Sequence, residues 1–192
     1  MNFEKTIQAI PQLHTHNHAH IIHGLVRWLK PTQVMEIGAY MGYMTCWLAR
    51  GMQENGLPGS HLYVVDDFSL HEGNPANITN ALAYVECNHV KTTIMPMRSQ
   101  DIELWPRIDM AFIDGDHSYE GVKHDFDKCV AAGAYCLIIH DTVGWHGPRR
   151  FIEELDRAEW HVLEVNFDSG LGICIKKFPK HECTYKEGAA VL

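Results

Sequence analysis

The sequence predicts an α/β fold in which helices cover both faces of a mostly parallel sheet of seven strands. Three observations support this class. Five short apolar runs alternate with amphipathic segments, as is typical of β-α repeats. The first run leads through a glycine-rich turn into a helical pattern. Two late runs, residues 160–165 and 172–176, are separated by the short turn Asp168-Ser169-Gly170, which favours an antiparallel hairpin at the end of a Rossmann-like, doubly wound sheet.

The expected elements follow one another in a regular order. Strands are expected at residues 33–37, 61–65, 92–95, 109–113, 134–139, 160–165 and 172–176. Helices are expected at residues 19–29, 42–53, 78–88, 122–130 and 149–157, with Ser118 capping the fourth. The chain then divides into a His-rich arm with a cap helix (1–30), one sheet domain (31–178) and a tail (179–192).

Composition excludes several classes of protein. The chain has 192 residues, 46% of them hydrophobic and 21% charged, which suits one globular domain. The net charge of -8 argues against a nucleic-acid or anionic-membrane partner. We see no signal peptide and no membrane-spanning run, and none of the six cysteines forms a Cys-x-x-Cys pair. We therefore expect a cytoplasmic protein with free thiols, and the sequence leaves open whether it is a homo-oligomer.

Five histidines crowd the start of the chain, namely His14, His16, His18, His20 and His23. The first four alternate, so no single helix face would collect them. We therefore expect an extended, solvated arm before the first helix. The spacing matches none of the standard zinc patterns.

The turn after the first strand is the first candidate binding element. Glu36 lies at the end of the strand, and Gly38 and Gly42 follow. Because a side chain at Gly38 would block a close approach, this turn suits a ligand that binds against the main chain. The second strand ends in Asp66 and Asp67. An acid at this place in a nucleotide-binding sheet hydrogen-bonds the ribose hydroxyls, and we expect Asp66 to do so ahead of Asp67.

Polar groups also follow the later strands. In open parallel sheets, ligands bind beyond the carboxyl ends of the strands. The third strand is followed by Ser99 and Gln100, which we place near the edge of an adenine ring. The fourth strand ends in Asp114 and the fifth in His140-Asp141. These groups are expected to gather at one edge of the sheet.

Two kinds of chemistry suit the acids and histidines of this edge. Asp114, His140 and Asp141 would lie on adjacent strand ends, although 26 residues separate Asp114 from His140. Carboxylates suit Mg²⁺ or Mn²⁺, and an imidazole ligand favours Mn²⁺. Without a metal, His117 or His140 is the expected general base, because imidazole titrates near pH 6.5.

Three stretches resemble motifs of the class I S-adenosylmethionine-dependent methyltransferases, in particular the subgroup of macrolide-sugar O-methyltransferases and cephalosporin-hydroxylase-like proteins. The stretches are Glu36-Ile37-Gly38-Ala39-Tyr40-Met41-Gly42, Phe112-Ile113-Asp114-Gly115-Asp116-His117-Ser118-Tyr119-Glu120-Gly121-Val122 and Leu137-Ile138-Ile139-His140-Asp141-Thr142. They occur in the family's order within residues 32–176. The second is the most specific, because it is long and rich in uncommon neighbours.

The resemblance implies a binding site for S-adenosylmethionine and the residues that form it. The methionine part would be held by Glu36, Gly38, Ala39, Tyr40 and Gly42. Asp66 would hold the ribose and Ser99 would approach the adenine, and Asp67, Gln100 and Asp114 complete the expected cofactor-binding residues.

The resemblance also implies the reaction, which is O-methylation of a small-molecule hydroxyl on a sugar, a natural product or a phenol. The catalytic residues would be Asp114, His117, His140 and Asp141. Asp114, His140 and Asp141 fall where metal-dependent members place three ligands, although those members usually have an acid at the position of His140. Residues 69–77 and the N-terminal arm are the expected lid and acceptor walls.

Three other functions remain open. An NAD-dependent oxidoreductase would carry Gly-x-Gly-x-x-Gly, which the first turn lacks. A metal-dependent hydrolase could use the acids and histidines, but it would leave the first turn unexplained. A non-catalytic relative could keep the cofactor and lack an acceptor site.

Overall fold

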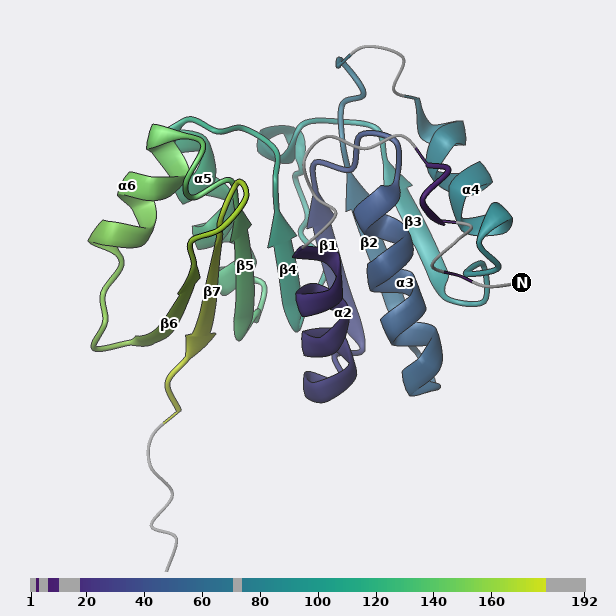
Figure 1. The fold of residues 1–192 in the computed structure, drawn as a ribbon, viewed down its shortest axis with the longest axis horizontal. Coiled ribbons are helices and arrows are strands. Elements are labelled where there is room, and N and C mark those ends of the chain that lie inside the picture. Colours follow the sequence, from purple (N-terminus) through teal and green to yellow (C-terminus); the bar gives the residue numbers. More distant parts are fainter. Residues whose placement is uncertain (1–2, 4–6, 11–17, 71–73, 179–192) are drawn as a thin grey trace, which may run out of the picture.

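The computed structural model describes residues 3, 7–10, 18–70 and 74–178 (Figure 1). The helices are α2 (His18–Leu29), α3 (Tyr43–Asn55), α4 (Pro75–Tyr84), the short 3₁₀ helix η1 (Ser99–Asp101), α5 (Tyr119–Ala131) and α6 (His146–Glu154). The strands are β1 (Gln33–Ile37), β2 (His61–Val65), β3 (Lys91–Met95), β4 (Met110–Ile113), β5 (Cys136–His140), β6 (Trp160–Val165) and β7 (Leu171–Lys176).

The seven strands form one sheet in the order β3-β2-β1-β4-β5-β7-β6. Pairs from β3 through β5 are parallel, whereas β7 is antiparallel to both β5 and β6. In Figure 1 the arrows of β4 and β5 point up and the arrow of β7 points down. The predicted doubly wound sheet with a terminal hairpin is confirmed. The strand order reverses between β1 and β4, so ligands are expected at the carboxyl ends of these strands.

Helices cover both faces of the sheet because consecutive residues of a strand point to opposite sides. Met110 and Phe112 of β4 belong to the core beneath α2, α3 and α4, whereas Ala111 and Ile113 belong to the core beneath α5 and α6. All four residues of this central strand are buried, as expected of a parallel strand covered on both faces. Figure 1 shows α2 and α3 in front of the sheet.

Helix ends follow local chemistry. Asn74 caps α4 by accepting a hydrogen bond from the main-chain N–H of Ala76, and Pro75 occupies the first turn. Ser118 caps α5, as predicted, by accepting from the N–H of Gly121 at 3.0 Å. The hydroxyl and amide oxygens thereby satisfy main-chain donors that a helix leaves free.

Some boundaries differ from the sequence expectation. α4 begins at Pro75 and ends at Tyr84, so the predicted loop is shorter and the helix ends earlier than expected. α6 begins at His146 because Pro148 fits the first turn of a helix.

The N-terminal histidines are placed differently from the prediction. α2 begins at His18, so His18, His20 and His23 are helical, and the expectation of a solvated arm at His18 is wrong because this side chain is fully buried. His14 and His16 lie outside the described residues, as do most of the predicted arm, residues 71–73 of the predicted lid and the predicted tail.

Two further expectations concern the whole chain. Cys46, Cys87, Cys129, Cys136 and Cys174 are free and buried, as predicted, and Cys183 lies outside the described part. Within the described residues, no helix is both long and apolar enough to cross a membrane.

Candidate functional site

A cavity of about 880 Å³ opens at the carboxyl ends of the parallel strands. It is lined by Ile37, Gly38, Ala39, Tyr40, Tyr43, Met44, Val65, Asp66, Asp67, Ser69, Leu70, Met97, Arg98, Ser99, Gln100, Asp114, Gly115, Asp116, His117, His140, Asp141 and Trp145. Residues that are far apart in the sequence meet here because the strand ends share one edge of the sheet. All predicted site residues line this cavity except Glu36 and Gly42.

Asp66, at the end of β2, binds the turn after β1 through hydrogen bonds. One carboxylate oxygen, Oδ2, accepts hydrogen bonds from the N–H groups of Ala39 at 2.7 Å and Tyr40 at 2.8 Å. The other, Oδ1, accepts from the N–H of Phe68 at 2.6 Å. Asp66 therefore shapes the turn, and Tyr40 is held at a left-handed φ of 50°. The neighbouring Asp67 is exposed and also lines the cavity.

Gly38 is required by a second strand rather than by a ligand. A Cβ at this position would lie 2.2 Å from the main-chain oxygen of Asp114, and the φ of Gly38 is +86°. The first turn thus packs directly on the end of β4, and glycine permits both the contact and the conformation. Because Gly38 also lines the cavity, the expectation that a side chain here would obstruct a ligand stays a prediction.

Glu36 and Gly42 lie outside the cavity lining. Glu36 is fully buried, and its Oε2 accepts a hydrogen bond from the hydroxyl of Thr45 at 2.5 Å. Burial raises the pKa of Glu36 to about 8, although the Thr45 hydrogen bond acts in the other direction. Gly42 precedes α3 at a φ of +87°, where its N–H donates to the carbonyl of Ala39. Both residues therefore support the turn from outside the cavity. At this position the Glu36 carboxylate does not reach a methionine moiety in the cavity directly.

The predicted adenine-binding residues follow β3 at one side of the cavity. Ser99 is buried and Gln100 is exposed, and both line the cavity in η1. Arg98, which also lines the cavity, pairs with the exposed Asp101, with its Nε 3.0 Å from Oδ2. Asp101 itself is not part of the lining.

Two carboxylates and two imidazoles form a cluster at the ends of β4 and β5. His140 Nδ1 lies 3.0 Å from Asp114 Oδ1 and 3.1 Å from Asp141 Oδ1. His117 Nε2 lies 3.4 Å from Asp114 Oδ1 and 3.1 Å from Asp141 Oδ2. The structure therefore brings together the four predicted catalytic residues. Each imidazole bridges both carboxylates.

The cluster shifts the pKa of its members in opposite directions. Hydrogen bonds from His117 to Asp114 and then to Asp141 raise the pKa of His117 to about 9. Burial lowers the pKa of His140, but the two carboxylates outweigh burial and raise it to about 10. Burial would likewise raise the pKa of Asp141, yet hydrogen bonds from the imidazoles hold it below its ordinary value. The cluster therefore favours two ionised carboxylates beside two protonated imidazoles.

The two imidazoles differ in exposure. The side chain of His140 is 2% exposed and that of His117 is 27% exposed. His117 stacks on Trp145 with ring centroids 4.9 Å apart and an interplanar angle of 10°. Trp145 lies just before α6, and the start of this helix packs tightly on the main chain of His117, where a Cβ at Gly147 would lie 2.2 Å from the carbonyl oxygen. The imidazole of His117 is thus held by Trp145 and the two carboxylates and still lines the cavity.

Sequence reasoning missed three residues of this site. Trp145 was assigned only to a loop, and Ser169 only to a turn. His18 was placed in the arm, yet its Nδ1 lies 3.2 Å from His140 Nε2, and the hydroxyl of Ser169 lies 3.1 Å from the same nitrogen. A tryptophan four residues after a strand-end acid was the one local signal that could have been used.

The donor set of this cluster also fits a divalent cation. Asp114, His140 and Asp141 each offer one ligand atom, and these atoms lie within 4.8 Å of one another. Two carboxylate oxygens and one imidazole nitrogen suit Mn²⁺ better than Mg²⁺. The same oxygens also accept from His117, so the cluster is satisfied by its own residues as well.

The cavity also fits an adenosyl cofactor. On one side it offers the main-chain turn at Gly38, Ala39 and Tyr40, then the exposed carboxylate of Asp67, whose Oδ1 accepts from the N–H of Ser69, and then Ser99 and Gln100. The main-chain N–H groups of such a turn can bind charged groups. An exposed carboxylate can accept hydrogen bonds from ribose hydroxyls, and an amide side chain can hydrogen-bond the edge of a base. On the other side lies the carboxylate and imidazole cluster.

Comparison with known proteins gives a family match. The family model described as a methyltransferase domain matches residues 35–142. This range contains the first turn, the acids after β2 and the cluster after β4 and β5. No curated protein matches the sequence.

Solved structures share the fold. The O-methyltransferase TomG from Streptomyces achromogenes, involved in tomaymycin synthesis and in complex with SAM, is 18% identical with a TM-score of 0.69, covering 92% of this chain and 89% of that chain. An O-methyltransferase from Bacillus cereus in complex with SAH is 17% identical with a TM-score of 0.67, covering 91% and 90%. A methyltransferase from Podospora anserina with bound SAH is 17% identical with a TM-score of 0.63, covering 92% and 86%.

Proposed function

The chain belongs to the methyltransferase domain family and has the class I fold of S-adenosylmethionine-dependent methyltransferases, and from this premise we propose that it methylates a hydroxyl oxygen of a small molecule. The observation that carries the proposal is that one cavity holds both a cradle for the cofactor and a carboxylate-held imidazole. The similarity to the fold of TomG, an O-methyltransferase, supports an oxygen acceptor.

The cofactor is held by the first three strand ends. The main-chain turn from Gly38 to Tyr40 would contact the methionine moiety, and the carboxylate of Asp67 would accept hydrogen bonds from the ribose hydroxyls. Ser99 and Gln100 would face the adenine. When bound, S-adenosylmethionine supplies an activated methyl group on its sulfonium.

His117 is the general base. Its Nε2 faces Asp114 and Asp141, so Nε2 carries a proton and Nδ1 is the ring nitrogen that takes the proton of the acceptor hydroxyl. The carboxylates orient the ring and stabilise the imidazolium that forms. His140 is buried and engaged at both ring nitrogens, which leaves it the role of positioning the carboxylates.

The acceptor enters beside apolar side chains. Trp145 is 55% exposed and Leu70 is 63% exposed, and both line the cavity. Such surfaces exclude water from the reacting oxygen and hold an acceptor by apolar contact. A phenol, a sugar of a natural product or a similar small molecule fits this surface.

Metal assistance is a second candidate because the donors of Asp114, His140 and Asp141 converge. A divalent ion there would lower the pKa of an acceptor hydroxyl and fix two neighbouring oxygens. Turnover that is unchanged in EDTA would exclude this version. Loss of turnover in EDTA, restored by Mn²⁺, would support it over the metal-free base.

The proposal is tested first by calorimetry. S-adenosylmethionine should bind, and NAD should not. A protein that gives no heat with S-adenosylmethionine contradicts the proposal. Transfer of the labelled methyl group to a panel of phenols and a panel of sugar glycosides then separates a methyltransferase from a relative that only binds the cofactor.

The free, buried cysteines support the further proposal of a reducing, cytoplasmic location.

A further inference from the structure

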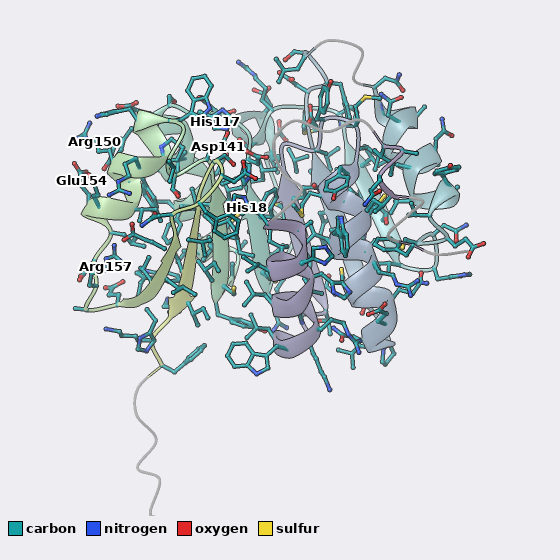
Figure 2. The ribbon with its side chains drawn as sticks, in the orientation of Figure 1. His18, His117, Asp141, Arg150, Glu154 and Arg157 are labelled. Atoms are coloured by element: carbon teal, nitrogen blue, oxygen red, sulfur yellow. The ribbon has the colours of Figure 1, made fainter. Side chains whose placement is uncertain are left out.

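The buried side chain of His18 connects α2 to the catalytic cluster. His18 is fully buried at the first position of the helix. Its Nδ1 lies 3.2 Å from His140 Nε2, and its Nε2 lies 3.1 Å from the carbonyl oxygen of Phe167. In Figure 2, His117, Asp141 and His18 follow one another from the top of the sheet toward α2. His18 precedes residues 35–142, so it lies outside the range that the family model matches.

The donors and acceptors around His18 and His140 determine which ring nitrogens carry protons. A carbonyl oxygen can only accept, so the Nε2 of His18 must carry the proton that points to Phe167. A neutral imidazole has one N–H, which leaves the Nδ1 of His18 as an acceptor. The Nε2 of His140 must then be the donor in the pair.

Donors and acceptors can be assigned in the same way for the other contacts of His140. The hydroxyl of Ser169 lies 3.1 Å from His140 Nε2 and can accept from it as well. The carboxylates can only accept, so His140 Nδ1 also carries a proton, which faces Asp114 at 3.0 Å and Asp141 at 3.1 Å. The ring is therefore held as a donor at both nitrogens, with Nε2–H toward α2 and Nδ1–H toward the carboxylates.

We propose that His18 is a positioning residue for methyl transfer, which fixes the ring orientation of His140 and through it the carboxylates that hold His117. This inference rests on the proposed function. His18 touches neither cofactor nor acceptor, and it acts only through His140. In this proposal α2 supports catalysis in addition to covering the core.

The kinetic test compares two substitutions. His18→Leu keeps apolar bulk and removes the acceptor, and we expect kcat to fall about 10- to 100-fold, in the range seen when supporting hydrogen bonds are removed. His18→Asn puts an amide oxygen near the position of Nδ1, and we expect it to restore kcat to within about threefold of the wild type. KM for the acceptor and the affinity for S-adenosylmethionine should change less than about twofold in both.

The control substitution lies on the same helix. His20→Leu removes an exposed imidazole whose ring contacts Trp47 at 4.7 Å, and it should leave kcat unchanged. Equal loss of kcat in His18→Leu and His18→Asn would show that His18 only fills space and would overturn the proposal. Wild-type kcat in His18→Leu would overturn it too.

A second readout needs no turnover, so it separates this proposal from the proposed function. In ¹⁵N-histidine NMR spectra, with His140 assigned by a His140→Gln variant, the wild-type protein should show a proton on His140 Nε2. His18→Leu should shift this signal and His18→Asn should keep it. An unprotonated His140 Nε2 in the wild type would contradict the proposal even if methyl transfer is established. A protonated one would support it even if no acceptor is found.

Discussion

His117 and His140 face the same two carboxylates, yet their surroundings give them different tasks. His117 keeps an accessible ring against Trp145, while His140 is enclosed and bonded at both nitrogens. Exposure, and not residue type, therefore distinguishes the two imidazoles, and it makes His117 the one proposed as the base.

Replacement of His117 by Ala should lower kcat by about 10²- to 10⁴-fold, the usual contribution of a general base. Binding of S-adenosylmethionine should remain within about threefold, because the cradle lies on the other strand ends. Single-turnover rates and calorimetry measure the two quantities. A variant with normal kcat would assign proton removal to another group.

The pH profile should follow the same residue. The base form of His117 is the deprotonated form, and the carboxylates raise its pKa to about 9. In EDTA, kcat should therefore rise with pH and level off only above about pH 9. A profile that levels off near pH 6.5 would mean that the carboxylates do not hold the proton on His117.

Asp66 and Asp67, the two acids after β2, should differ in role: Asp66 is expected to be structural and Asp67 to bind the cofactor. Asp67→Ala should weaken S-adenosylmethionine binding about 10- to 100-fold with little change in thermal stability, because two hydrogen bonds to a charged group are lost. Asp66→Ala should lower the melting temperature as well, since Asp66 accepts from three main-chain N–H groups. Equal effects on binding and stability in both variants would contradict this division.

At the scale of elements, the site depends on how closely the β1 turn meets β4. Gly38 approaches the main chain of Asp114 so tightly that no side chain fits. The turn proposed to hold the cofactor and the cluster proposed to act in catalysis thus share one close contact. A shift in the turn would move Asp114 as well.

Gly38→Ala should therefore lower the free energy of unfolding and abolish S-adenosylmethionine binding. The matched control is Gly56→Ala, which also has a positive φ, of +61°, but meets nothing within 4 Å. The control should cost only the left-handed conformation, about 1–2 kcal/mol, and keep binding. Denaturant unfolding and calorimetry measure both, and equal costs in the two variants would show that the contact with Asp114 is unimportant.

The sequence predicted strands better than it predicted contacts between them. β1, β2 and β6 have the predicted bounds, because continuous apolar runs mark buried strands. The strand-end acids were predicted to meet because parallel strands share a carboxyl edge. His18 and Ser169 could not be predicted, since each reaches the cluster through packing of elements that no local pattern specifies, and for Trp145 the local signal was its spacing of four residues from Asp141.

At the scale of the whole molecule, one buried acid should make stability depend on pH. Burial raises the pKa of Glu36 from 4.5 to about 8 in the folded protein. The unfolded chain releases this proton at lower pH than the folded protein does, so the contribution is fully present below pH 4.5 and is lost progressively as pH rises to about 8.

Glu36→Gln should flatten this dependence. The variant carries a neutral side chain at every pH, so its free energy of unfolding should exceed that of the wild type by a few kcal/mol at pH 8 and approach it near pH 4.5. Urea titrations at several pH values measure the difference. The matched control Glu159→Gln, at an exposed position, should leave the dependence unchanged.

The insertion of β7 between β5 and β6 has a consequence for the synthesis of the protein. β6 is made first, but among the described strands its one partner is β7, so it has no place in the sheet until β7 has been made. Phe167 and Ser169, which contact His18 and His140, lie in the turn just before that strand. On the ribosome, the contacts of this turn with His18 and His140 can therefore form only after the residues of β1 to β5 have all been made.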